Sequence, residues 1–316
     1  MRALILRCLQ QELFILKTDK MLKRTLFFSN PCQLTVKNRQ LVAELKDGGE
    51  IKTAPVEDLG FVVLENQQIS ISMPLIEELV GNNVAVVYCD RTYHPHAMLL
   101  NLNGHHLQQE LFSHQIAAGI PLKKQLWKQT VEAKIRNQAA LLKCLGKEYR
   151  HVAYYAGHVK SGDTDNREGA AARMYWPELF GSDFSRERYG TVPNNMLNYA
   201  YAVLRAAVAR ALAGSGLLAT LGIHHHNRYN AFCLADDIME PYRPFADGLV
   251  FMLYDQFGDA GELSTGIKMK LLEVLSVDVW FGKKKRPLMI ALSNTTASLA
   301  RCYNGEDRRI SYPAII

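Results

Sequence analysis

Three clusters of residues in the second half of the sequence combine side chains that can hold a metal ion. Glu168 lies in the segment NREGAAARMYW, three consecutive histidines lie in the segment 222–230, and Asp237 and Glu240 follow shortly afterwards. On a helix, Asp237 and Glu240 would share a face because they are three residues apart. Hard carboxylate oxygens with one imidazole nitrogen suit Mn²⁺ or Mg²⁺. Such an ion can activate a hydroxyl nucleophile and neutralise charge on a phosphodiester oxygen.

Each cluster alone also fits an ordinary structural role. Glu168 would sit in the first turn of a helix capped by Asp165 or Asn166, where the helix dipole stabilises an acidic side chain. Three adjacent histidines cannot all reach one metal, so we expect one ligand there or none. Asp237 and Glu240 would form a solvated acidic face, but their apolar neighbours indicate a packed helix. A carboxylate at the edge of a packed face more often has a partner.

Basic residues near these clusters predict contact with a polyanion. Four arginines lie close to Glu168 in the sequence, and guanidinium groups pair well with phosphate. A second basic run lies near the end of the chain. The predicted DNA-binding residues are Arg167, Arg173, Arg186, Arg188, Lys283, Lys284, Lys285 and Arg286, with Arg308 and Arg309 as a further basic pair.

The elements that must position these residues change character along the chain. From about Lys23 to Cys89, short β-branched and aromatic runs alternate with turn residues, among them the hairpin signal Asp47-Gly48, and one short helix is predicted over 74–81. Beyond about residue 100, apolar residues recur at spacings of three and four, which predicts amphipathic helices. We therefore predict an α+β protein with a small β-rich N-terminal domain and an all-helical C-terminal catalytic domain. The predicted domains are 21–100, a β-rich dimerisation domain, and 101–316, the catalytic domain. Residues 1–20 are expected to be a disordered extension or a start-site artefact.

Composition narrows the class of protein. The chain has 316 residues and a formal net charge of +6, which permits a nucleic-acid partner without requiring one. Its six cysteines are scattered without a CxxC pair, so neither a thiolate zinc site nor a disulfide framework is expected. No run approaches the roughly 20 apolar residues of a membrane span, and the N-terminus lacks a signal-peptide pattern. We expect a cytoplasmic protein without a membrane partner.

Four motifs make the sequence similar to a known family. They are MLKRTLFFSNP at 21–31, REGAAARMYW at 167–176, NNMLNYAYAVLRA at 194–206 and LGIHHHNRYNAFCLADDIMEPYRPFAD at 221–247. Together they resemble the CRISPR-associated spacer-acquisition integrase, the universal adaptation nuclease, in the form that accompanies type II systems. The motifs occur in the expected order over most of the chain from residue 21 onward.

The resemblance implies a set of site residues. It assigns the catalytic metal ligands to Glu168, His225 and Glu240, with Asp237 as a supporting residue or a further ligand. Glu240 stands where many relatives have Asp, so the site must accommodate a longer side chain. Within the triple histidine, His225 is chosen by its spacing to the acidic pair, and His224 is the main alternative.

The resemblance also implies an activity and partners. Similar proteins are homodimers that flank a small ferredoxin-like companion subunit in a hetero-hexamer. In CRISPR adaptation, a branch of antiviral defence, they join the 3′-hydroxyls of a short duplex to the CRISPR repeat, a metal-dependent endonuclease and integrase chemistry. Two alternatives stay open at this point: a DNA-binding scaffold without catalysis, and a helical metal-dependent phosphohydrolase acting on a small substrate.

Overall fold

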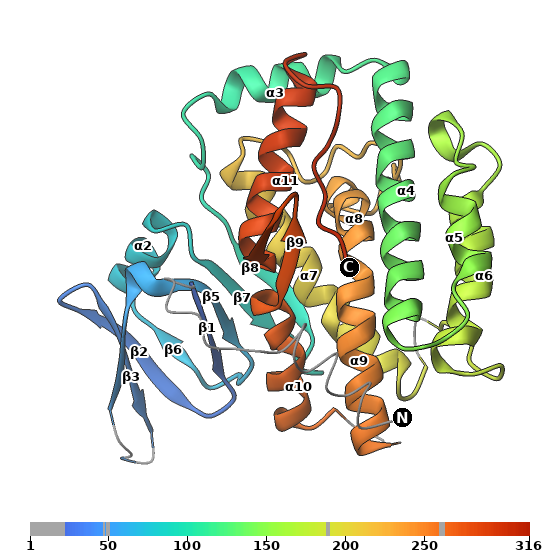
Figure 1. Ribbon diagram of the computed structural model, residues 1–316. Coiled ribbons are helices and arrows are strands. Elements are labelled where there is room, and N and C mark those ends of the chain that lie inside the picture. The colour runs from blue at the N-terminus through green and yellow to red at the C-terminus, as the bar shows by residue number, and fades with distance from the viewer. Residues whose placement is uncertain (1–22, 47, 49–50, 188–189, 259–262) are drawn as a thin grey trace. The chain divides into compact units, whose positions relative to one another are not determined.

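The computed structural model divides into two compact units, one rich in strands and one rich in helices (Figure 1). The predicted α+β class is confirmed. The boundary between the units falls between His106 and Leu107. The predicted extension 1–20 lies outside the described residues, which are 23–46, 48, 51–187, 190–258 and 263–316.

The strand-rich unit contains two four-stranded sheets within its described residues. One sheet has the order β1-β5-β7-β8 and the other the order β4-β3-β2-β6. β1, β5 and β7 pair in parallel, and β8 is antiparallel to β7. The elements are β1 (Arg24–Phe28), β2 (Cys32–Lys37), β3 (Gln40–Leu45), β4 (Lys52–Pro55), η1 (Val56–Asp58), β5 (Leu59–Leu64), β6 (Ser70–Ile71), α2 (Met73–Gly81), β7 (Ala85–Cys89) and β8 (Pro95–Leu99).

Local sequence explains the connections between these strands. Asn38 and Arg39 join β2 to β3 as a two-residue loop, and both have positive φ (51° and 58°), as a type I′ hairpin turn requires. The Asp47-Gly48 signal lies between β3 and β4, which pair antiparallel, although residue 47 itself is not among the described residues. The parallel pairing of β5 with β7 needs a crossover, and α2 lies within it.

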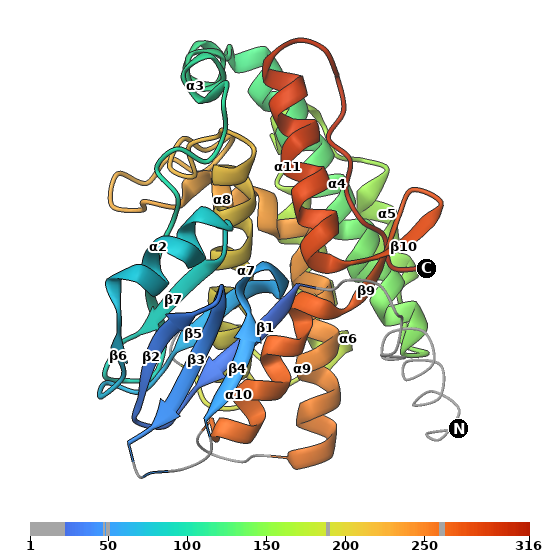
Figure 2. The same cartoon turned by 90° about the vertical axis from the view of Figure 1, so that its left-hand side faces the viewer.

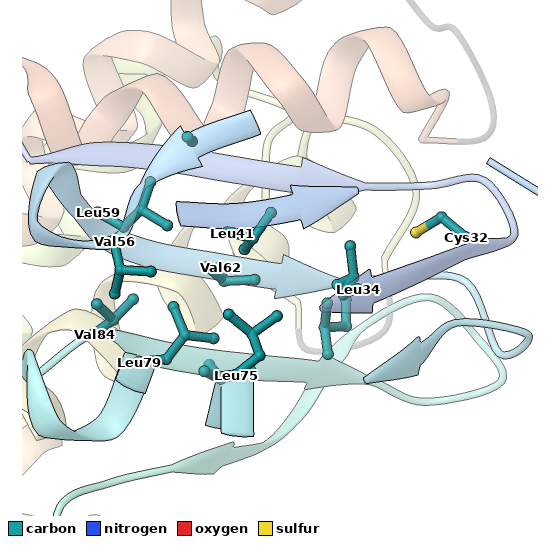
Figure 3. Packing of buried hydrophobic residues seen from close by; sticks show 12 residues of the cluster. Cys32, Leu34, Leu41, Val56, Leu59, Val62, Leu75, Leu79 and Val84 are labelled. Atoms are coloured by element: carbon teal, nitrogen blue, oxygen red, sulfur yellow. The ribbon is translucent and has the colours of Figure 1, made fainter. Parts of the chain in front are cut away.

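One apolar cluster fills the strand-rich unit. Figure 3 shows side chains from both sheets meeting Leu75 and Leu79 of α2. Leu34, Val62, Leu75 and Leu79 are fully buried. All six residues of β5 are buried, as expected for a strand covered on both faces. This cluster gives the unit a core of its own.

The second unit is mainly helical. Its elements are α3 (Gln108–Ala117), α4 (Ile120–Cys144), α5 (Arg150–Ala156), η2 (Ser161–Asp163), α6 (Arg167–Phe180), α7 (Asn194–Gly214), α8 (Cys233–Met239), η3 (Glu240–Tyr242), α9 (Arg243–Phe257), α10 (Thr265–Leu272), η4 (Glu273–Ser276), β9 (Asp278–Phe281), β10 (Lys284–Pro287) and α11 (Leu288–Tyr303). The prediction of an all-helical C-terminal domain is wrong at one place, because β9 and β10 form an antiparallel hairpin that helical periodicity does not predict. In the parts of the chain that the structure describes, no helix has the length and apolar character of a membrane span.

The long helix α4 contacts α6, α8 and η3, the helical elements that carry Glu168, Asp237 and Glu240. It packs against α5 and α6, and Figures 1 and 2 both show the three helices running side by side. It also contacts α8, α9 and η3. Its buried face is not purely apolar, because Lys134, Asn137 and Gln138 lie among Trp127, Leu141 and other buried residues. These polar side chains therefore face neighbouring elements instead of water.

Truncation of Leu75 tests whether the apolar cluster stabilises the strand-rich unit. Leu75→Ala removes a fully buried side chain, and we expect the free energy of unfolding of this unit to fall by about 2–5 kcal/mol. Leu102→Ala is the matched control, because Leu102 lies in the same unit and is 92% exposed. Urea unfolding of both variants measures the difference. Equal loss in the two variants would contradict the packing described here.

Candidate active site

Two caps fix the first turn of α6, where Glu168 lies. The Asn166 side chain accepts a hydrogen bond from the Gly169 amide at 3.0 Å, as predicted for a cap residue. The buried carboxylate of Asp163 accepts from the amides of Arg167 (2.8 Å) and Glu168 (3.0 Å). A Cβ on Gly169 would lie 2.7 Å from the Asn166 side chain, so this cap needs glycine there. The backbone of Glu168 is thus held from two sides.

Asp165, the other predicted cap residue, has a different role. Its carboxylate pairs with Lys160 at 2.8 Å and with Arg167 at 3.4 Å. Both pairs lie at the surface, where ion pairs contribute little to stability. The capping prediction is therefore confirmed for Asn166, and Asp163 is a cap that the sequence analysis did not identify.

Asp237 organises the histidine loop. It is fully buried on α8, and its carboxylate accepts from the backbone amides of Ile223 (2.6 Å), His224 (2.9 Å) and His225 (3.2 Å). The same carboxylate contacts Nδ1 of His225 at 2.6 Å. A Cβ on Gly222 would lie 2.1 Å from the His225 carbonyl oxygen, so the loop can close this tightly only with glycine. Nδ1 of His225 is therefore engaged, and Nε2 is the nitrogen that remains for a ligand.

The three histidines occupy three different environments. His224 stacks on the buried ring of Trp127, with centroids 4.2 Å apart and planes at 3°. His225 meets the same indole edge-on at 5.8 Å, and its side chain is 44% exposed. His226 contacts the His224 carbonyl oxygen through Nδ1. This arrangement favours His225 over His224 as the ligand, in agreement with the spacing argument.

Lys134 brings the two predicted glutamates together. Its Nζ lies 2.5 Å from Oε1 of Glu168 and 2.6 Å from Oε2 of Glu240. The other oxygen of Glu240 pairs with Arg243 at 2.9 Å. Glu240 is only 3% exposed, and Pro241 beside it is anchored to α4 because its carbonyl accepts from Asn137 at 2.8 Å. Both carboxylates thus contact the same cation.

The opposite charges of Lys134, Glu240 and Arg243 stabilise one another's charged forms. Burial acts to lower the pKa of Lys134, but the carboxylates of Glu240 and Glu168 outweigh it and raise that pKa. Burial acts to raise the pKa of Glu240, but Arg243 and Lys134 outweigh it and lower that pKa. The hydrogen bond to Asp237 is the main cause that raises the pKa of His225, whereas burial lowers the pKa of His224. At neutral pH the lysine is charged and Glu240 is ionised.

As the side chains stand in the described ranges, no group of three or more His, Cys, Asp or Glu residues forms a ligand set for a metal ion. The ammonium of Lys134 contacts two of the three predicted ligands instead. The donors nevertheless suit a hard divalent cation, because they are two carboxylates and one imidazole. A positive charge already lies against both carboxylates, and among the residues that the structure describes Oε2 of Glu240 has no partner other than Lys134. The residues therefore fit a cation.

A buried carboxylate lies on α9, in the helix that follows Glu240. Asp247 accepts hydrogen bonds from the hydroxyls of Tyr175 (2.8 Å) and Tyr201, and both tyrosines are buried. Arg243 lies over the ring of Tyr201 at 4.6 Å. Burial raises the pKa of Asp247 to about 6, although both hydroxyls act to lower it.

The predicted DNA-binding residues differ in their exposure and in their hydrogen bonds. Arg186 donates to the carbonyl of Glu187 and to the side chains of Asn194 and Asn198, so it is tied into its own unit. Arg173 is exposed on α6, and Arg167 is half-buried. In the hairpin, Lys283, Lys284 and Lys285 are exposed and Arg286 is half-buried. Arg188 lies outside the described residues.

Lys134 and Arg243 are the site residues that the sequence analysis missed. A signal for Lys134 was present, because it lies at the spacing of the apolar stripe of α4, where a lysine is out of place. Arg243 is three residues after Glu240, which is one helical turn. Trp127 carried no signal, since an aromatic residue on a helix face is ordinarily part of the core.

Comparison with known proteins assigns the chain to a family. A family model described as CRISPR associated protein Cas1 matches residues 26–257. The chain belongs to the Cas1 family. A CRISPR-associated endonuclease Cas1 from Neisseria meningitidis serogroup C (strain 8013) is 37% identical over 277 residues, covering 87% of this chain and 90% of that protein. The resemblance seen in the four motifs is confirmed.

Solved structures with the Cas1 fold agree. A casposase bound to integration product superposes with a TM-score of 0.73 at 19% identity, covering 91% of this chain and 92% of the other. A Cas6-RT-Cas1–Cas2 complex gives a TM-score of 0.69 at 18% identity, covering 92% of this chain and 36% of the other. At these identities the likeness establishes the Cas1 fold for this chain.

Asp247 makes stability depend on pH. Its folded pKa of about 6 lies above its ordinary 3.8, so the folded state binds the extra proton between these values. The free energy of unfolding should therefore decline by up to about 3 kcal/mol as pH rises from 4 to 6. Asp247→Asn should remove this decline, and urea unfolding at pH 4 and pH 7 measures it. Asp255→Asn, at an exposed position of the same helix, is the control and should keep the decline.

Proposed function

We propose that this chain is a metal-dependent DNA endonuclease and integrase that inserts short foreign DNA fragments into a CRISPR array. Membership of the Cas1 family supports this, as does a relative at 37% identity that is named an endonuclease. The fold shared with a casposase bound to integration product is consistent with it. The single observation that carries the proposal is that Glu168 and Glu240 both contact the ammonium group of Lys134. His225 is oriented by Asp237 in the loop at 222–230.

In this proposal Glu168, Glu240 and Nε2 of His225 hold a Mg²⁺ or Mn²⁺ ion. When bound, such an ion lowers the energy of 3′-hydroxyl attack by neutralising charge on the phosphodiester oxygens. The chain's own part is to hold the three ligands still. The caps of α6 fix Glu168, Arg243 holds one oxygen of Glu240, and Asp237 fixes the ring of His225.

Asp237 is assigned a positioning role instead of a ligand role. Its two oxygens already accept three backbone N–H groups and contact Nδ1 of His225. A carboxylate that holds the far nitrogen of a ligating histidine fixes the tautomer and makes the other nitrogen a better ligand. Of the three acidic residues in DDIME, Asp236 pairs with Arg205, Asp237 holds the histidine loop, and Glu240 contacts Lys134.

The reaction needs partners that the single chain does not supply. The substrates are a short DNA duplex and the CRISPR repeat, and the new P–O bond replaces the one that breaks. We propose a homodimer that joins a small ferredoxin-like companion subunit in a hetero-hexamer, acting in the cytoplasm. A structural neighbour in a Cas1–Cas2 complex is consistent with such an assembly.

Glu168→Gln and His225→Ala test the site. Each removes a metal ligand, so we expect cleavage of branched DNA with Mn²⁺ to fall at least about 100-fold. Glu178→Gln, exposed on the same helix as Glu168, is the control and should keep wild-type activity. Wild-type rates in the His225 variant would contradict the ligand assignment. DNA binding without any metal-dependent cleavage by the wild type would favour the non-catalytic scaffold.

Arg186 and Lys284 should affect DNA binding differently. Lys284 is exposed, so if it contacts a phosphate Lys284→Ala should reduce the salt dependence of DNA binding by about one unit of slope. Arg186→Ala should instead lower the free energy of unfolding, because its guanidinium is bonded to Asn194 and Asn198. Binding titrations across a salt series and urea unfolding measure the two effects. A smaller salt slope in Arg186→Ala and a lower free energy of unfolding in Lys284→Ala would contradict the roles assigned to these two residues.

A further inference from the structure

Lys134 occupies a position that a metal ion would also need, and this inference rests on the proposed function. Its Nζ contacts Glu168 Oε1 at 2.5 Å and Glu240 Oε2 at 2.6 Å, the two predicted ligands that face each other across it. We propose that Lys134 is the internal counter-ion of the metal site. It holds both carboxylates in place before the metal binds, and the metal displaces its ammonium from them.

Burial explains why a counter-ion is needed. Glu240 is 3% exposed and Lys134 is 9% exposed, so neither charge can rely on water. Two carboxylates that share one small space repel each other unless a cation lies between them. Arg243 neutralises only the other oxygen of Glu240, and within the described part of the chain Lys134 alone reaches Oε2. In the metal-free protein, Lys134 is therefore what keeps Oε2 of Glu240 and Oε1 of Glu168 close together.

Repulsion explains why the ammonium must leave. A divalent ion on the same two oxygens would lie against Nζ, and like charges repel strongly where water is excluded. Lysine suits this exchange, because its charge is a point on a flexible four-carbon stem that can withdraw. Arg243 can stay, since it contacts Glu240 through Oε1. The site thus exchanges one cation for another while the carboxylates keep their places.

Replacement of Lys134 by an uncharged side chain of similar length tests the competition. Mn²⁺ binding to the full chain is measured by calorimetry for the wild type and for Lys134→Met. We expect the variant to bind Mn²⁺ roughly tenfold more tightly, within the usual range of coupling between two binding events. Lys128→Met is the control, because Lys128 lies on the same helix and its ion pair is with Glu132, at 3.7 Å. It should bind Mn²⁺ as the wild type does.

The same variants give a readout from stability. Without metal, Lys134→Met leaves Glu168 without its cation and Glu240 with Arg243 alone, so the melting temperature of the variant should fall below that of the wild type. Added Mn²⁺ should raise the melting temperature of Lys134→Met by more than it raises that of the wild type or of Lys128→Met. A structural lysine with no link to the metal would lower the melting temperature but leave the Mn²⁺ response unchanged.

A measurement on the wild type covers the case in which Lys134→Met does not fold. Reductive methylation followed by mass spectrometry reports how accessible each lysine is. Lys134 should react slowly without metal and several-fold faster with Mn²⁺, because the displaced ammonium becomes exposed. Lys128 should react equally under both conditions.

The outcomes separate this inference from the proposed function. Absence of Mn²⁺ binding by the wild type, or binding that survives Glu168→Gln unchanged, would overturn the proposed metal site. Wild-type binding that depends on Glu168, with no gain of affinity in Lys134→Met or no change in Lys134 labelling, would overturn the counter-ion role alone. Tighter binding in Lys134→Met and faster labelling with Mn²⁺ would support it.

Discussion

Charged groups taken out of water need partners, and that constraint shapes the helical unit around Glu240. Its carboxylate is buried, and Arg243 and Lys134 each take one of its oxygens. Lys134 in turn reaches Glu168, so the ionic group extends from η3 through α4 to α6. A carboxylate in this setting stays ionised only while its cations stay near. The packing of these three elements is therefore tied to the chemistry of their side chains.

The polar residues on the buried face of α4 follow from the same constraint. A helix in contact with so many neighbours would ordinarily present an apolar surface to all of them. Here the polar positions meet groups that need a donor, such as the carboxylates near Lys134 and the carbonyl of Pro241 near Asn137. Buried donors with matched acceptors specify one alignment of α4, because a rotated helix would leave them unpaired. The same hydrogen bonds therefore determine both the position of the site and the packing of α4.

The sequence allowed the β-rich and helical parts and the cap at Asn166 to be predicted, because short β-branched runs, spacings of three and four and capping residues carry that information locally. The grouping of Glu168 with Glu240 was predicted from the family resemblance. The roles of Asp237 and Lys134 depended on contacts between distant segments. Asp237 turns toward the loop at 223–225, and Lys134 comes from a helix more than 30 residues before Glu168. A single sequence does not show which distant segments come into contact. The sequence feature that pointed to Lys134 was a charged residue within the apolar stripe of α4.

The anchoring of Pro241 links the catalytic region to the end of the chain. The Asn137 side chain donates to the carbonyls of Pro241 (2.8 Å) and Pro313 (3.1 Å), and its oxygen accepts from the amide of Ile315 at 3.1 Å. One amide group thus joins the residue after Glu240 to the segment 313–315. A fusion partner or affinity tag attached after Ile316 would pull on this junction.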